Sequence, residues 1–127
     1  MRAVRYHEHG DSSVLAVEPI DRPEPRRDEI LVEVGAAAVN PVDTYFRTGE
    51  YTPAGLPMIP GADVAGTVAA IGPAVQNLEV GDRVFGTGLG NDRQGTYAEY
   101  AVGPADHFAS LPGPVSFSEE LLSPWSV

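Results

Sequence analysis

The sequence predicts a mainly β domain, a compact barrel or sandwich with one or two short helices. Six or seven short apolar stretches alternate with turn-forming residues, as in small all-β folds. The 14 glycines and 12 prolines make up about twice their usual share, which favours turns over long helices. With 127 residues, 43% of them hydrophobic, the chain has the size of one domain with its own core.

Charge and composition exclude several classes of partner and site. The chain carries 18 acidic and 8 basic residues, a net charge of −10, whereas nucleic acids and anionic membranes select basic surfaces. It has no cysteine, and therefore no disulfide, thiolate metal site or cysteine nucleophile. No apolar stretch approaches the ~20 residues of a membrane span, and residues 1–5 lack the apolar core of a signal peptide. We therefore expect a cytoplasmic protein that binds neither nucleic acid nor membrane.

The basic residues are all arginine, and the chain has no lysine. An acidic, lysine-free composition suits a protein that works in concentrated salt, where counterions screen the repulsion between its charges. A GC-rich genome that prefers arginine codons explains the same composition. Both explanations, including adaptation to high salt, stay open.

Three strands are predicted in the first third of the chain. Residues 2–7 and 14–17 read as the first two, and Pro19 ends the second because proline lacks the N–H that a β-ladder requires. The clearest strand covers residues 29–34. One of its faces carries Ile30, Val32 and Val34, and the other carries Glu29, Leu31 and Glu33.

A short helix is predicted over residues 40–49. Asn40 is a favoured N-cap residue, Pro41 suits the first helical position, and Asp43 lies near the positive end of the helix dipole. Gly49 fits the position that ends such a helix. Signals for both ends therefore bound the same ten-residue stretch.

The rest of the chain is predicted to hold three more strands. Residues 62–72 read as a strand that Gly66 breaks. Residues 80–85 read as a turn leading into a strand, and residues 95–102 as a well-alternating strand. A glycine- and proline-rich run follows, after which residues 116–120 resemble the start of a second helix.

Two local patterns are candidates for ligand binding. His7 and His9 are spaced to share one strand face, as a metal pair would be, but no third ligand is identified and His107 is distant in sequence. Exposed or hydrogen-bonded histidines fit the pattern better. Residues 86–90 are glycine-rich but lack the G-x-G-x-x-G spacing and a strong following helix, so phosphate binding is not predicted.

Five motifs follow one another along the chain. They are MRAVR at 1–5, VNPVDTYFRTGEY at 39–51, PGADVAGTV at 60–68, VGDRVF at 80–85 and GTYAEY at 95–100. Together they resemble the N-terminal half of NADPH:quinone oxidoreductases of the zeta-crystallin type, in the medium-chain dehydrogenase/reductase superfamily; the run at 39–51 is the most diagnostic. The resemblance implies a GroES-like, partly open β-barrel over residues 1–120, with one or two short helices.

The resemblance also implies a branch of that superfamily. Its zinc alcohol dehydrogenases carry a metal-binding cysteine after the third strand and a Gly-His-Glu motif, where this chain reads Val39-Asn40-Pro41 and Gly61-Ala62-Asp63. The implied branch is the one without zinc, which transfers a hydride from NADPH to a quinone or an activated alkene. Among the matching site residues, Asn40 and Tyr51 would act at the acceptor. Tyr45, together with Asn40, would contact the cofactor.

The end of the chain departs from this family. Members continue into a Rossmann domain that binds the NADPH pyrophosphate, whereas residues 121–127 form a divergent tail. We therefore expect a chain without its Rossmann domain that binds NADPH weakly, is inactive alone and self-associates through uncovered apolar surface. Two alternatives stay open: a non-catalytic binding or assembly domain or truncated gene product, and, less favoured, a zinc alcohol dehydrogenase relative.

Overall fold

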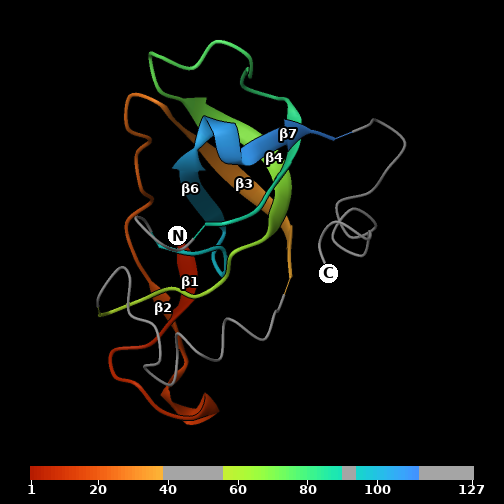
Figure 1. The fold of residues 1–127 in the computed structure, drawn as a ribbon. Helices are drawn as coiled ribbons and strands as arrows, with labels where there is room; N and C mark the ends of the chain where they lie inside the picture. Colours follow the sequence, from red (N-terminus) through yellow and green to blue (C-terminus); the bar gives the residue numbers. More distant parts are fainter. Residues whose placement is uncertain (39–55, 90–93, 112–127) are drawn as a thin grey trace.

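The computed structural model describes residues 1–38, 56–89 and 94–111, and within them the chain forms seven strands and two short 3₁₀ helices (Figure 1). In chain order these are β1 (Arg2–Arg5), η1 (Ser12–Val14), β2 (Ala16–Pro19), β3 (Glu29–Ala37), β4 (Val64–Ile71), β5 (Arg83–Gly86), β6 (Tyr100–Pro104), η2 (Ala105–His107) and β7 (Phe108–Ser110). No helix in these ranges is long and apolar enough to cross a membrane. The predicted mainly β class is confirmed.

The strands form an antiparallel five-stranded sheet, in the order β6-β3-β4-β5-β7, and a two-stranded ribbon of β1 and β2 (Figure 1). The two edge strands of the larger sheet, β6 and β7, are joined by only the three residues of η2. In a flat sheet these edges would lie roughly 19 Å apart, whereas four residue steps reach about 14 Å at most. The sheet must therefore curl until its edges approach, which gives the partly open barrel that the sequence predicts.

The core fills the interior of this curled sheet. Its buried members come from all five strands and from the loops between them: Ile30, Val32, Val64, Val68, Leu78, Val84, Leu89, Ala101 and Phe108. Phe108 on β7 reaches both its neighbour β5 and the opposite edge β6. A Cβ on Gly86 would lie 2.5 Å from its ring, and one on Gly103 would lie 3.7 Å from it. These two glycines leave the space in which the closing aromatic ring packs.

The β1–β2 ribbon is attached to the barrel along its β1 edge. Isolated β-bridges join Ala3 to Ala98 and Tyr6 to Met58, and the buried Tyr6 hydroxyl donates a hydrogen bond to the Met58 sulfur at 3.2 Å. Tyr6 and Met58 form a second small core, with Val14 packed against it. The ribbon thereby fixes the chain at residue 58, directly before the segment that leads into β4.

The N-terminal strands differ from the prediction in their bounds. The first is shorter than expected and leaves Tyr6 as a bridge. The predicted strand at 14–17 is wrong in its bounds: Val14 lies in η1, and β2 runs from Ala16 through Pro19. Pro19 is the last residue of β2. A proline is tolerated there because β2 is an edge strand, where a missing N–H is acceptable. The predicted strand at 29–34 is present and extends to Ala37.

The predicted break of the fourth strand at Gly66 is also wrong, since β4 is continuous from Val64 to Ile71. A Cβ on Gly66 would lie 2.1 Å from the carbonyl oxygen of Glu33, so the glycine permits close contact with β3 instead of interrupting the strand. The short strand β7 lies in the glycine- and proline-rich run, where no strand was predicted. The helices predicted at 40–49 and 116–120 lie outside the described residues.

We predict that Gly66→Ala destabilises the barrel by about 1–3 kcal/mol, because its methyl group would collide with β3 backbone that is held by strand pairing. The free energy of unfolding in urea measures the loss. Thr67→Ala, at the adjacent half-buried position of the same strand, is the control and should cost less. Equal stability of Gly66→Ala and the wild type would show that β3 and β4 do not approach this closely.

Candidate functional site

Four segments of the chain meet at Asp63, directly before β4. The Asp63 backbone carbonyl accepts hydrogen bonds from the Ala38 amide and from the Thr96 hydroxyl, both at 3.3 Å. Its carboxylate Oδ1 accepts a hydrogen bond from the Thr87 hydroxyl. We call Ala38, Gly61, Asp63, Thr87 and Thr96 the Asp63 junction. It joins the end of β3, the start of β4, the loop after β5 and the segment before β6.

The backbone at Gly61 brings two of these segments together. Gly61 has φ +108°, and a Cβ there would lie 2.2 Å from the Thr96 hydroxyl oxygen, so only glycine fits. The Thr96 amide donates to the Gly61 carbonyl at 3.2 Å, and the Gly95 amide donates to the Ile59 carbonyl at 2.8 Å. The Pro-Gly pair that opens the motif at 60–68 thus allows the backbone at Gly61 to come close to the backbone at Thr96.

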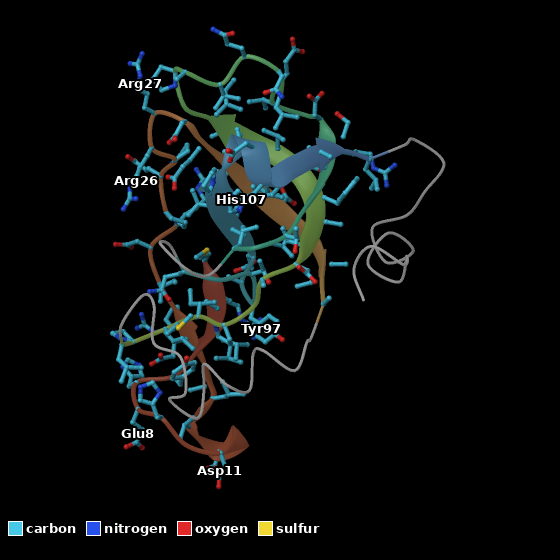
Figure 2. All side chains as sticks on the ribbon, in the orientation of Figure 1. Glu8, Asp11, Arg26, Arg27, Tyr97 and His107 are labelled. Carbon is cyan, nitrogen blue, oxygen red and sulfur yellow. The ribbon has the colours of Figure 1, made fainter. Side chains whose placement is uncertain are left out.

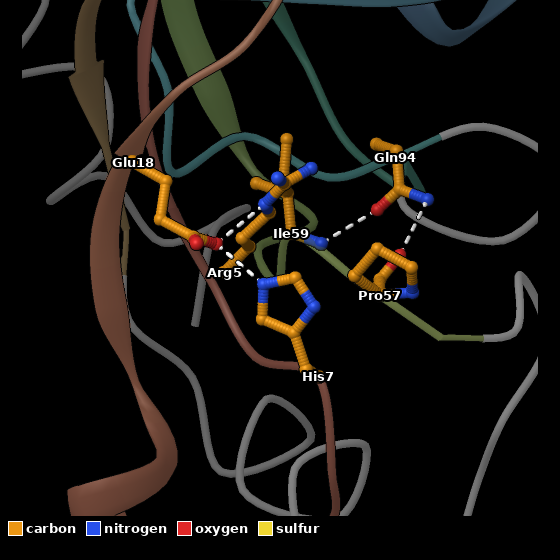
Figure 3. A network of polar contacts seen from close by, with 6 residues as sticks. All are labelled: Arg5, His7, Glu18, Pro57, Ile59 and Gln94. Carbon is orange, nitrogen blue, oxygen red and sulfur yellow. Dashed lines mark hydrogen bonds and ion pairs between the residues drawn. The ribbon is translucent and has the colours of Figure 1, made fainter.

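Gln94 fixes the same segment from its other end. Its side-chain oxygen accepts a hydrogen bond from the Ile59 amide at 2.5 Å, and its side-chain nitrogen donates one to the Pro57 carbonyl at 3.2 Å (Figure 3). One amide side chain therefore holds residues 57 and 59 in a defined position ahead of Gly61.

Asp63 is a buried residue, 5% exposed as a whole. A buried charge is costly unless hydrogen bonds replace the water that it loses, and the Thr87 hydroxyl provides one of these bonds. The two residues that follow, Val64 and Ala65, are fully buried and apolar. The junction therefore holds a carboxylate at a place where the surrounding strand is otherwise hydrophobic.

The predicted site residues Asn40, Tyr45 and Tyr51 lie outside the described residues. The structure does describe Ala38, two residues before Asn40, and bonds it to Asp63. The structure thus places the residue after β3 next to the segment that leads into β4.

Two amides of the glycine-rich loop at 86–90 are hydrogen-bonded to backbone carbonyls. The Thr87 amide donates to the His107 carbonyl at 3.3 Å, and the Leu89 amide donates to the Ala62 carbonyl at 3.1 Å. The Leu89 side chain is buried in the core. Both amides are therefore engaged in hydrogen bonds within the protein.

The three histidines each have their own surroundings in the structure. The Nε2 atom of His7 lies 2.7 Å from a Glu18 carboxylate oxygen, which Arg5 also contacts at 2.6 Å (Figure 3). His9 packs near the Tyr6 ring, with 6.0 Å between the ring centroids. His107 lies on the barrel, in a different part of the molecule from the turn that carries Glu8 and Asp11 (Figure 2). Among the residues that the structure describes, no group of three potential ligands is arranged for a metal.

Sequence reasoning missed the roles of Asp63, Thr87, Thr96 and Gln94. Asp63 was considered only as the counterpart of a zinc ligand. The available signal was a single acidic residue placed inside the apolar run Ala62–Ala65, which is unusual at the start of a buried strand.

Comparisons with known proteins extend this picture. The alcohol dehydrogenase GroES-like domain family matches residues 26–113. The quinone oxidoreductases of Lama guanicoe and Homo sapiens are 43% and 42% identical to the chain over 122 residues. Each match takes in 94% of this chain and 36% of the relative, so the chain spans about a third of the length of the curated relatives that it matches.

Solved structures show the same likeness. A quinone oxidoreductase of Pseudomonas syringae matches with a TM-score of 0.87 and 33% identity, over 93% of this chain and 35% of its own. The Escherichia coli quinone oxidoreductase complexed with NADPH matches with a TM-score of 0.86 and 34% identity, over 94% of this chain and 36% of its own.

The contacts of Glu18 with Arg5 and His7 predict that the thermal stability of the chain depends on pH. Hydrogen bonds from Arg5 and, second, from His7 lower the pKa of the Glu18 carboxyl below its ordinary value of 4.5. Since the folded-state pKa is the lower one, this contribution is present above about pH 4.5 and is lost as the pH falls through the folded-state value. Glu18→Gln should therefore lower Tm at neutral pH and have little effect in strong acid, as followed by circular dichroism.

The exposed Glu8→Gln is the matched control and should leave Tm unchanged at neutral pH. An equal loss for Glu18→Gln at neutral and at strongly acidic pH would mean that packing of Glu18, and not its charge, stabilises the ribbon.

Proposed function

The chain belongs to the alcohol dehydrogenase GroES-like domain family, and from this premise we propose that it forms the acceptor-binding domain of an NADPH-dependent quinone oxidoreductase. Such an enzyme transfers a hydride to a quinone or an activated alkene. The observation that carries the proposal is the match to quinone oxidoreductases over 94% of the chain, in sequence and in a structure complexed with NADPH.

We propose that this chemistry proceeds without zinc. The chain has no cysteine, and of Gly61, Ala62 and Asp63 only the last has a side chain that binds metals. Its buried carboxylate is hydrogen-bonded to Thr87. The acceptor carbonyl must then be polarised by hydrogen bonds, which act strongly in a site shielded from water.

NADPH supplies the hydride in this proposal, and we place its contacts with this chain at Tyr45 and Asn40. The described residues do not fit the phosphate groups of the cofactor. The helices described there are three residues long, so they offer no extended helix N-terminus for an anion. The described loop amides of Thr87 and Leu89 are bonded to backbone carbonyls. The phosphates would bind to a part that the relatives carry in their remaining length, and we expect no turnover by this chain alone.

Asn40 and Tyr51 are the residues that we propose at the acceptor. An asparagine amide donates hydrogen bonds, so Asn40 is suited to stabilise the negative charge that develops on the acceptor oxygen. Tyr51 would cover the acceptor and orient it. Both follow Ala38, which the structure fixes at Asp63, so the Asp63 junction anchors the entry to the proposed acceptor site.

The test is a titration of the ¹⁵N-labelled chain with 1,2-naphthoquinone, followed by NMR. We expect the largest amide shifts at Ala38, at residues 61–63 and at Thr96, and an affinity about tenfold lower in Asn40→Ala, the worth of one hydrogen bond. The chain has neither cysteine nor lysine, so quinone adducts on those side chains cannot imitate binding. Tyr100→Phe, beneath Arg22, is the control and should bind normally.

Two outcomes would contradict the proposal. Absence of quinone binding, or shifts confined to other parts of the barrel, would remove the acceptor role. Oxidation of NADPH by the isolated chain in the presence of the quinone would show that the chain needs no additional nucleotide-binding part.

One observation favours the alternative of a binding or assembly domain. Val17 on β2 is 59% exposed and, with Val4 and Val34, lines an open groove of about 460 Å³. Apolar side chains in a groove are typical of contact surfaces. If the groove mediates self-association, Val17→Asp will convert an oligomer to a monomer in analytical ultracentrifugation and leave quinone binding unchanged. A monomeric wild type would contradict this alternative.

A further inference from the structure

Asp63 is a buried acidic residue directly before an apolar strand. The position lies between Ala62 and the fully buried Val64, in a chain that already has a net charge of −10. An apolar side chain there would continue the hydrophobic start of β4 and avoid the cost of desolvating a carboxylate. The strand pairing of β4 begins only at Val64.

The hydrogen bonds of Asp63 connect its side chain and its main chain to different segments. The side chain is bound to Thr87 in the loop after β5. The main-chain carbonyl is bound to Ala38 at the end of β3 and to Thr96 before β6. Asp63 therefore links the Thr87 loop to the point where the chain leaves β3.

Thr87 is itself anchored on its other side. Its amide donates to the His107 carbonyl, and Leu89, two residues later, donates to the Ala62 carbonyl. The loop is thus held to η2 and to the segment before β4, while the Thr87 side chain is turned toward Asp63. The Thr87 hydroxyl thus adds a side-chain bond to Asp63 beside the backbone bond from Leu89 to Ala62.

We propose that Asp63 and Thr87 are a positioning pair for the acceptor site, and this proposal rests on the function proposed above. The Thr87 hydroxyl holds the Asp63 carboxylate, and Asp63 in turn holds Ala38 and Thr96 in the arrangement that the acceptor requires. Neither residue needs to touch the acceptor. Hydride transfer is sensitive to such placement, since an error of about 1 Å can cost on the order of a hundredfold in rate.

The test compares Thr87→Val, which removes the hydroxyl but keeps the side-chain shape, with Thr87→Ser, which keeps the hydroxyl. We expect Thr87→Val to shift the NMR resonances of the Ala38 and Leu89 amides and to weaken 1,2-naphthoquinone binding about tenfold, because displaced site residues contact the quinone less well. Thr87→Ser should restore both. Thr67→Val makes the same chemical change on β4, away from the junction, and should alter neither.

The outcomes separate this proposal from the function on which it rests. If the wild type does not bind the quinone, the proposed function fails and the positioning role fails with it. If the wild type binds but Thr87→Val leaves the affinity and the Ala38 amide unchanged, the positioning role alone is overturned. Should Thr87→Val not fold, Asp63→Asn decides, because it keeps an oxygen acceptor but loses the charge. A loss of affinity of about threefold supports the pair, and wild-type affinity overturns it.

Discussion

The three-residue connection between β6 and β7 is the constraint on which the rest of the structure depends. These strands lie at opposite edges of the larger sheet, so a connection this short forces the edges together. The closing contact is a single aromatic ring, Phe108, which occupies the space left by Gly86 on one strand and Gly103 on another. A side chain at Gly86 would collide with that ring, and one at Gly103 would press against its neighbour Leu89.

Strand pairing creates the Asp63 junction. Because Val64 on β4 pairs with Ala37 on β3 and with Gly86 on β5, the residues Ala38 and Thr87 that follow those strands come next to Asp63. The segment before β6 comes to the same place because β6 pairs with β3. Four pieces of chain that are distant in sequence then share one buried carboxylate and its backbone carbonyl.

The family of the chain was predictable from its sequence, whereas the described contacts of the candidate site were not, and the branch without zinc stays a prediction. The motif at 39–51 predicted Asn40, Tyr45 and Tyr51, which stay predictions, as do the cytoplasmic location and the adaptation to salt. Asp63 bonds to Thr87 and Thr96 across 24 and 33 residues of sequence, and Gln94 bonds to Ile59 across 35. Hydrogen bonds between such distant residues are set by the fold, so they cannot be predicted from a local sequence pattern.

The amino-acid order by itself determined the β class, the main strands and the family, because alternation, turn residues and short motifs are properties of neighbouring residues. Tertiary contacts decided the rest. They made Gly66 a site of close strand contact instead of a break, extended β2 through Pro19 and buried the Asp63 carboxylate. The physical reason is that space, burial and the partners of a polar group depend on which other segments pack against it, and this is fixed only when the sheet closes.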